Sequence, residues 1–138
     1  MKKLSAKEIV FCLLIIFGIM ISSFFASMAF ESRIFFPIVA ASSILLFAFG
    51  IILIRIAKQE KGKLKKALLL TSISAISPFV FTLFHNFFYG LNITFKNVSF
   101  LFEILGVVSF LIAIFVAPIT FIIGAVCSIM HFRREPKK

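Results

Sequence analysis

Few residues of this chain have side chains that could do chemistry, and four of them lie in two neighbouring segments. His85, Asn86 and Tyr89 fall within five positions, and Glu103 follows 14 residues after Tyr89. A histidine side chain exchanges a proton near neutral pH, and a carboxylate in a low-dielectric setting can couple to it. We expect these four residues to form a polar cluster in which His85 is the partner of Glu103.

This cluster is open to three interpretations. His85 and Glu103 can pair with each other, or with backbone groups, and simply hold two helices together. They can instead handle a proton or an ion, or they can bind a ligand or a lipid headgroup. Ionisable residues inside a membrane segment are candidates for function by default, so all three interpretations stay open from the sequence.

Residue types exclude several other chemistries. The chain has no Asp, so a Ser-His-Asp triad cannot form. Zinc usually takes three or four protein ligands, whereas the chain has only two His residues, and His131 lies ~40 Å of helix away from Glu103. Cys12 and Cys127 are isolated and form no CxxC motif. We therefore predict no metal and no cofactor, and the sequence does not favour an enzyme.

Four long apolar runs must position the polar cluster. They cover residues 9–30, 34–57, 67–89 and 100–130, each near or above the ~20 residues that an α-helix needs to cross a bilayer. The 138 residues are 62% hydrophobic and 14% charged, whereas soluble domains are about 25% charged. The first run also imitates a signal peptide, but its ~20 apolar residues exceed the usual length of about 7–15, so we expect a retained span. The sequence predicts a single all-α membrane domain over residues 1–138.

The distribution of charge predicts the topology. Of the 15 basic residues, all but Arg33 and Lys96 lie in the N-terminal segment, the second connection or the C-terminal segment. Positively charged segments stay on the cytoplasmic side, so we expect both termini to be cytoplasmic. The predicted fold is a transmembrane four-helix bundle made of two antiparallel hairpins. The predicted location is the cell membrane, specifically a prokaryotic plasma membrane. The net charge of +10 follows from this pattern and does not indicate nucleic-acid binding.

The second connection carries six basic residues with only Glu60 against them. Such a run orients the protein, and it can also bind anionic lipid headgroups at ~1 kcal/mol per well-placed Lys or Arg. Both roles are open from the sequence. The six residues are Arg55, Lys58, Lys61, Lys63, Lys65 and Lys66.

The third run carries a polar stripe along one face of the predicted helix. Its members are spaced three or four residues apart and fall within an arc of about 80°. In lipid this face has to meet protein or water, because an unsatisfied polar group is costly there. Pro78 lies in the stripe, and we expect it to kink the helix. The stripe consists of Thr71, Ser74, Pro78 and Thr82, and continues to His85 and Tyr89.

Small residues form stripes on two other runs, here called the first and second small-residue seams. Such seams let helices approach each other closely. We expect the second seam to meet the polar stripe, and we expect Pro118 to break the fourth run, which is longer than a bilayer requires. The first seam contains Gly18, Ser22 and Ala26, and the second contains Gly106, Ala113, Ala117 and Gly124.

The C-terminal half also resembles a known kind of protein. The pattern Ser77-Pro78, His85-Asn86-Phe87-Phe88-Tyr89-Gly90, Glu103, Pro118 and Gly124 is similar to one in small uncharacterised prokaryotic four-span membrane proteins. The resemblance implies a four-span fold and no known activity.

Three functions follow from these features. We favour a non-enzymatic helix-bundle protein that binds a membrane protein partner or forms a homo-oligomer, because the seams suit helix association. The alternative is a small proton- or ion-coupled transporter or channel that uses the polar stripe and a His85–Glu103 pair. A membrane enzyme at the outer interface is the third. A dry, tightly packed interior would favour the first function, and a water-accessible groove along residues 71–89 would favour the second. A closed outer pocket around His85 and Glu103 would favour ligand binding or catalysis.

Overall fold

The computed structural model describes residues 5–30 and 34–134. Within these ranges the chain is all-α and contains no strand, as the sequence predicts. The helices are α1 (Ala6–Phe30), α2 (Phe35–Ala57), α3 (Gly62–Thr94), the 3₁₀ helix η1 (Lys96–Val98), α4 (Ser99–Leu111), the π segment η2 (Ile112–Val116) and α5 (Ala117–Arg134). Arg33 of the predicted charge pattern lies outside the described residues, as do Lys2, Lys3, Lys137 and Lys138.

The described helices include four that are long and apolar enough to cross a membrane. They are α1, α2, α3 and the continuous rod of 38 residues that contains η1, α4, η2 and most of α5. This number agrees with the four apolar runs of the sequence. The chain is therefore compatible with a multi-pass membrane protein.

α1 begins before the predicted apolar run because Ser5 and Glu8 cap it. The Ser5 amide and hydroxyl donate to Glu8 Oε2 over 2.7 and 2.9 Å, and the Glu8 amide donates to Ser5 Oγ over 3.3 Å. This reciprocal pattern is a capping box, which satisfies amide groups at a helix start that have no acceptor within the helix.

α3 is longer than predicted at both ends. It begins at Gly62, whose φ of +64° lies in the left-handed region that favours glycine. At its other end it continues to Thr94, where the Thr94 hydroxyl donates to Gly90 O over 2.9 Å. The apolar run of the sequence covers only residues 67–89, and the helix continues beyond this run at both ends.

The fourth span is interrupted where Pro118 enters it. A proline has no N–H to donate, and its ring clashes with the carbonyl four residues earlier. The π segment η2 precedes Pro118 and widens the turn there, which relieves this clash. α3, in contrast, continues as one α-helix through the buried Pro78.

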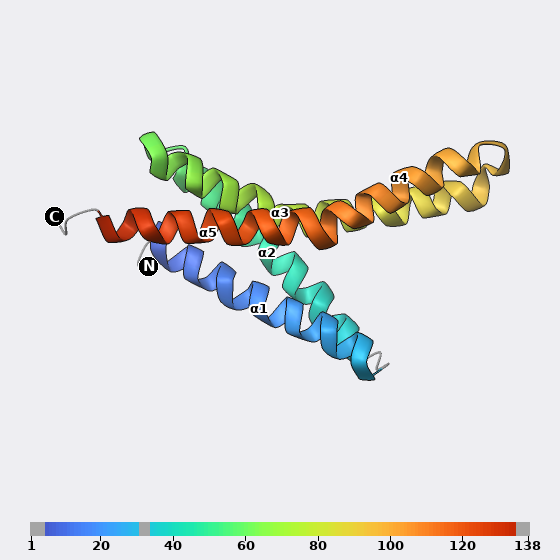
Figure 1. Cartoon of the computed structure of the whole chain (residues 1–138), viewed down its shortest axis with the longest axis horizontal. Helices are drawn as coiled ribbons and strands as arrows, with labels where there is room; N and C mark the ends of the chain where they lie inside the picture. The colour runs from blue at the N-terminus through green and yellow to red at the C-terminus, as the bar shows by residue number, and fades with distance from the viewer. Residues whose placement is uncertain (1–4, 31–33, 135–138) are drawn as a thin grey trace.

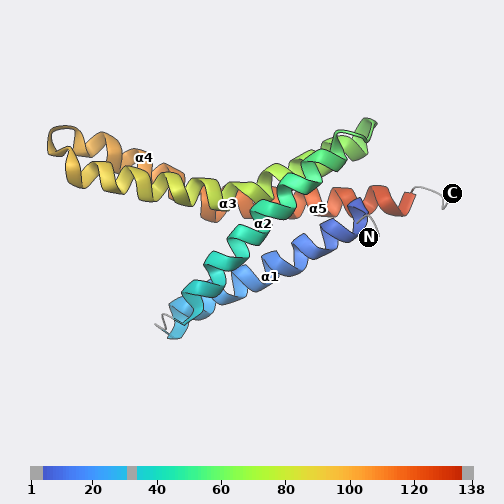
Figure 2. The ribbon, with the colours of Figure 1, turned by 180° about the vertical axis from the view of Figure 1, so that it is seen from behind.

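The helices form a V (Figures 1 and 2). α1 lies beside α2, α2 beside α3, and α3 beside both α4 and α5. We call one end of the molecule the basic end, because it holds the first turn of α1, the α2–α3 connection with its lysines, and the last turns of α5. From there the α1–α2 pair and the α3–α4 pair separate toward the other end, here called the far end.

The core occupies the half of the molecule near the basic end. Phe17 of α1 and Phe121 of α5 meet there with ring centroids 4.6 Å apart. α2 comes so close to α3 that a Cβ on Gly50 would lie 2.7 Å from Ile76 Cγ1 and 3.1 Å from Ser72 O. On α3 no residue between Pro78 and Thr94 is fully buried. The buried core includes Ile9, Val10, Leu13, Leu46, Leu53, Leu68 and Ala125.

Candidate functional site

The half of the polar stripe near the basic end is buried against α5. Thr71 and Ser74 are 0% and 3% exposed. The Thr71 hydroxyl donates to Ala67 O over 2.9 Å and lies 3.3 Å from Ser128 Oγ, and Ser74 Oγ donates to Thr120 Oγ1 over 2.8 Å. These residues therefore connect α3 to α5 through hydroxyl groups.

Thr120 links this contact to the π segment. Its hydroxyl accepts the hydrogen bond from Ser74 and lies 2.8 Å from Val116 O and 3.1 Å from Ala117 O, to which it donates. Val116 is the last residue of η2. The widened turn of η2 disturbs the regular helical hydrogen bonds. The Thr120 hydroxyl bonds to two carbonyls at the end of this turn.

The other half of the polar stripe is on the surface. Thr82 and Tyr89 are exposed, as is Asn86, while His85 is half-buried. In Figure 1 the later part of α3 runs beside α4 and away from α1 and α2. The polar stripe thus divides at Pro78 into a buried part and an exposed part.

His85 has a backbone partner. Its Nδ1 lies 2.9 Å from Gly106 O, and its ring packs on Phe110 with centroids 5.3 Å apart. A carbonyl oxygen only accepts, so Nδ1 carries the hydrogen, and Nε2 is the acceptor of the neutral ring. Between residues 5–30 and 34–134 no ion pair joins His85 to Glu103, which is exposed. Of the two kinds of partner considered from the sequence, the backbone group is the one observed.

His85 and Glu103 nevertheless border the same pocket between α3 and α4. Its volume is about 190 Å³. Asn86 is not part of its lining, and Asn92 is. Asn92 was outside the predicted cluster, although its spacing of three from Tyr89 continues the polar stripe by one more turn. The lining residues are His85, Tyr89, Asn92, Phe102, Glu103, Gly106 and Val107.

The second small-residue seam lies against α3. Gly106, Ala113, Ala117 and Gly124 are all buried. A Cβ on Gly124 would lie 2.7 Å from the Thr71 backbone nitrogen, whereas a Cβ on Gly106 would have its nearest neighbour, His85 Nδ1, at 3.7 Å. Of these two glycines, Gly124 therefore lies closer to α3.

The first small-residue seam has no such neighbour in the described part of the chain. Gly18 and Ser22 are exposed and Ala26 is half-buried. No heavy atom lies within 4 Å of a Cβ built on Gly18. α1 instead packs through larger side chains, among them Leu13 and Phe17.

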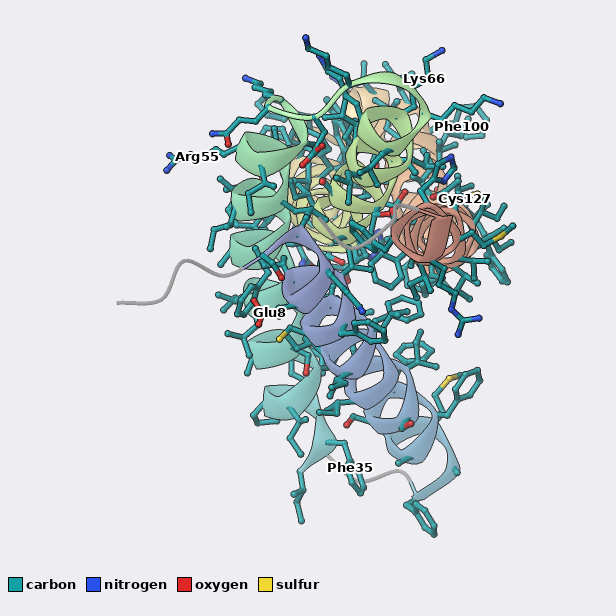
Figure 3. All side chains as sticks on the ribbon, turned by 90° about the vertical axis from the view of Figure 1, so that its left-hand side faces the viewer. Glu8, Phe35, Arg55, Lys66, Phe100 and Cys127 are labelled. Atoms are coloured by element: carbon teal, nitrogen blue, oxygen red, sulfur yellow. The ribbon has the colours of Figure 1, made fainter. Side chains whose placement is uncertain are left out.

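The basic residues of the second connection lie at the surface. Lys65 is half-buried and the others are exposed. Figure 3 views the molecule from the basic end and shows Arg55 and Lys66 at its periphery. The exposed members are Arg55, Lys58, Lys61, Lys63 and Lys66.

Among the residues that the structure describes, no group of three or more His, Cys, Asp or Glu side chains could hold a metal ion. Cys12 and Cys127 are half-buried free thiols. Comparison of the chain with protein-family models, curated proteins and solved structures finds no match. The arrangement of the helices and the pocket are therefore the features that bear on function.

Proposed function

We propose that this chain is a non-enzymatic membrane protein that works by associating with other membrane-embedded helices. The observation that carries the proposal is the division of the molecule into a packed half and a separated half (Figure 1). Near the basic end the helices bury a common core, and toward the far end each pair of helices stands alone.

The packed half supports a structural role for the polar stripe. Within the described part of the chain, no buried side-chain nitrogen or oxygen lacks a hydrogen-bond partner. Thr71 and Ser74 bond to α5 or to their own helix, so this interior needs no water to satisfy them. A transport pathway would instead require polar groups that face water, which favours the helix-bundle function.

A strip of α1 that is left uncovered supports association with a further helix. Gly18 and Ser22 leave a smooth strip on α1 that no helix covers in the described ranges. Membrane helices associate through small residues of this kind, because their backbones can then approach closely. The proposed occupant is a helix of a membrane protein partner, and a second copy of this chain is the other outcome of the test.

The proposal includes the topology that the charges predict. The four spans form two antiparallel hairpins, with both termini on the cytoplasmic side of a prokaryotic plasma membrane. In this orientation the exposed residues from Arg55 to Lys66 lie beside the cytoplasmic leaflet, where anionic headgroups attract them.

Photocrosslinking in intact membranes tests the association. A photoreactive amino acid at Gly18 or Ser22 is expected to give a discrete crosslink to one partner protein or to a second copy. The same amino acid at Ile119, which is 57% exposed on α5, is the matched control and is expected to crosslink lipid alone. Equal crosslinking from all three positions, or lipid adducts only, would contradict the proposal.

Proton-coupled transport is the second candidate, and the shared pocket of His85 and Glu103 is the observation that favours it. In reconstituted vesicles with an imposed pH gradient, a transporter would carry a proton flux that Glu103→Gln abolishes. A flux that the variant leaves unchanged would exclude a relay through these two residues.

A further inference from the structure

We propose that the pocket between α3 and α4 binds an ammonium group. The source of this group is the headgroup of an aminolipid such as phosphatidylethanolamine, or a small soluble amine. The proposal goes beyond helix association and depends only on the pocket and its depth. Its lining, charge, size and position each support it.

The polar side chains of the lining offer hydrogen-bond acceptors. Glu103 contributes a carboxylate, Asn92 an amide oxygen and Tyr89 a hydroxyl oxygen. His85 Nδ1 donates to Gly106 O, so Nε2 is an acceptor whenever the ring carries a single hydrogen. A primary ammonium carries three N–H donors and no acceptor, so it complements such a set.

Charge favours a cation over a neutral ligand. Glu103 forms no ion pair with any side chain in the described part of the chain, so no described cation neutralises it. Phe102 and Tyr89 add aromatic rings to the lining, and the faces of such rings attract cations.

Size and apolar lining restrict the ligand further. The volume of about 190 Å³ is below the roughly 300–1,000 Å³ of pockets for drug-sized molecules. Val107 and Phe102 provide apolar surface for a few methylene groups. An aminoethyl group has this composition: one cation on a short hydrocarbon chain.

The depth of the pocket favours a lipid as the source. Glu103 lies four residues after the start of α4, or about 6 Å along the axis, and His85 lies nine residues before the end of α3, or about 14 Å. The headgroup layer on each side of a bilayer is about 5–8 Å thick. With η1 at the membrane surface, the pocket lies where headgroups meet hydrocarbon.

Native mass spectrometry of the full-length chain tests the proposal. The protein is titrated in detergent with dioleoyl-phosphatidylethanolamine and, separately, with dioleoyl-phosphatidylglycerol. We expect tighter binding of the ethanolamine lipid, and a loss of at least about tenfold in its affinity in Glu103→Gln, because the charged acceptor is removed. Glu60→Gln, the same change at the basic end, is the matched control and is expected to bind like the unaltered chain.

Asn92→Leu is the second variant, since it removes an acceptor without changing the charge, and we expect it also to weaken binding of the ethanolamine lipid. Competition with free ethanolamine separates the two sources: displacement at equal concentration supports a soluble amine, and failure to displace supports the lipid. Equal affinity for the two lipids, or unchanged affinity in both pocket variants, would overturn the proposal.

Discussion

Gly124 and Gly106 both lie on the face of the fourth span that meets α3, in different surroundings. A Cβ on Gly124 would lie 2.7 Å from the Thr71 nitrogen and 3.0 Å from its Cα, and a helix backbone cannot move aside easily. We expect Gly124→Ala to lower the free energy of unfolding by about 1–3 kcal/mol. Reversible unfolding in mixed micelles measures this change.

Gly106→Ala is the matched control. Its new methyl group would meet its nearest atom, His85 Nδ1, at 3.7 Å, which is an ordinary contact. Alanine also favours a helix over glycine by roughly 0.5–1 kcal/mol, so this variant is expected to be as stable as the parent or slightly more stable. Equal losses from the two substitutions would show that helix proximity at Gly124 is not the cause.

The partner of His85 leads to a second prediction. His85→Phe keeps a ring against Phe110 but removes the donor to Gly106 O, so we expect a loss of about 0.5–1.5 kcal/mol in stability. Glu103→Gln is expected to change stability by less than about 0.5 kcal/mol, because Glu103 is exposed. The same unfolding assay measures both variants. A loss of stability in Glu103→Gln larger than about 0.5 kcal/mol would mean that an ion pair of Glu103 holds the helices together.

At the scale of helices, the contact between α3 and α5 includes the hydrogen bond from Ser74 to Thr120. A double-mutant cycle with Ser74→Ala and Thr120→Val is expected to give a coupling energy of about 0.6 kcal/mol, with about 1.7 kcal/mol as the upper end for such bonds. Unfolding free energies of the two single variants and the double variant supply the cycle.

Ser77→Ala replaces Ser74→Ala in the control cycle. The Ser77 hydroxyl donates to Ile73 O of its own helix over 2.8 Å. Its coupling to Thr120→Val is therefore expected to be zero within error. A similar coupling in the two cycles would indicate a general disturbance of α3 instead of a specific bond.

The number and type of helices could be predicted from the sequence, because hydrophobic length and low charge leave few alternatives to membrane-spanning helices. The end of α3 could not be predicted in this way. Asn92 and Thr94 are polar, and hydropathy assigns polar residues to a loop. In the structure they extend the helix, where Thr94 bonds to the carbonyl of Gly90.

The candidate site shows a similar limit. The sequence predicts that His85 and Glu103 belong to one polar cluster, and both border one pocket. The acceptor for His85 Nδ1 is the backbone of Gly106. Every residue carries such a carbonyl, so no residue type signals this partner. Likewise the spacing of Gly18 and Ser22 indicates a smooth face without indicating what covers it.

At the scale of the whole molecule, the V shape predicts a distance distribution. Spin labels at Met28 on α1 and Ile93 on α3, both exposed near the far end, are expected to lie farther apart than about 20–24 Å, the width of two adjacent helices. Pulsed electron paramagnetic resonance in lipid nanodiscs measures the distribution, in a chain with Cys12 and Cys127 replaced by Ala.

Labels at Phe11 and Val126 provide the reference, because both are exposed positions on helices that meet in the packed half. This pair is expected to give the shorter and narrower distribution. Similar distances for the two pairs would mean that the helices run together over their whole length and that the V shape is absent in lipid.

A V-shaped protein that spans a bilayer occupies a different area in each of the two leaflets. Because the helix pairs share the basic end and separate toward the far end (Figure 2), the footprint of the molecule is larger in the far leaflet, whether lipid tails or a partner helix fill the opening. A bilayer accommodates a mismatched inclusion by deforming at a modest energetic cost. The chain is therefore expected to concentrate where the membrane curves with its convex side toward the far end.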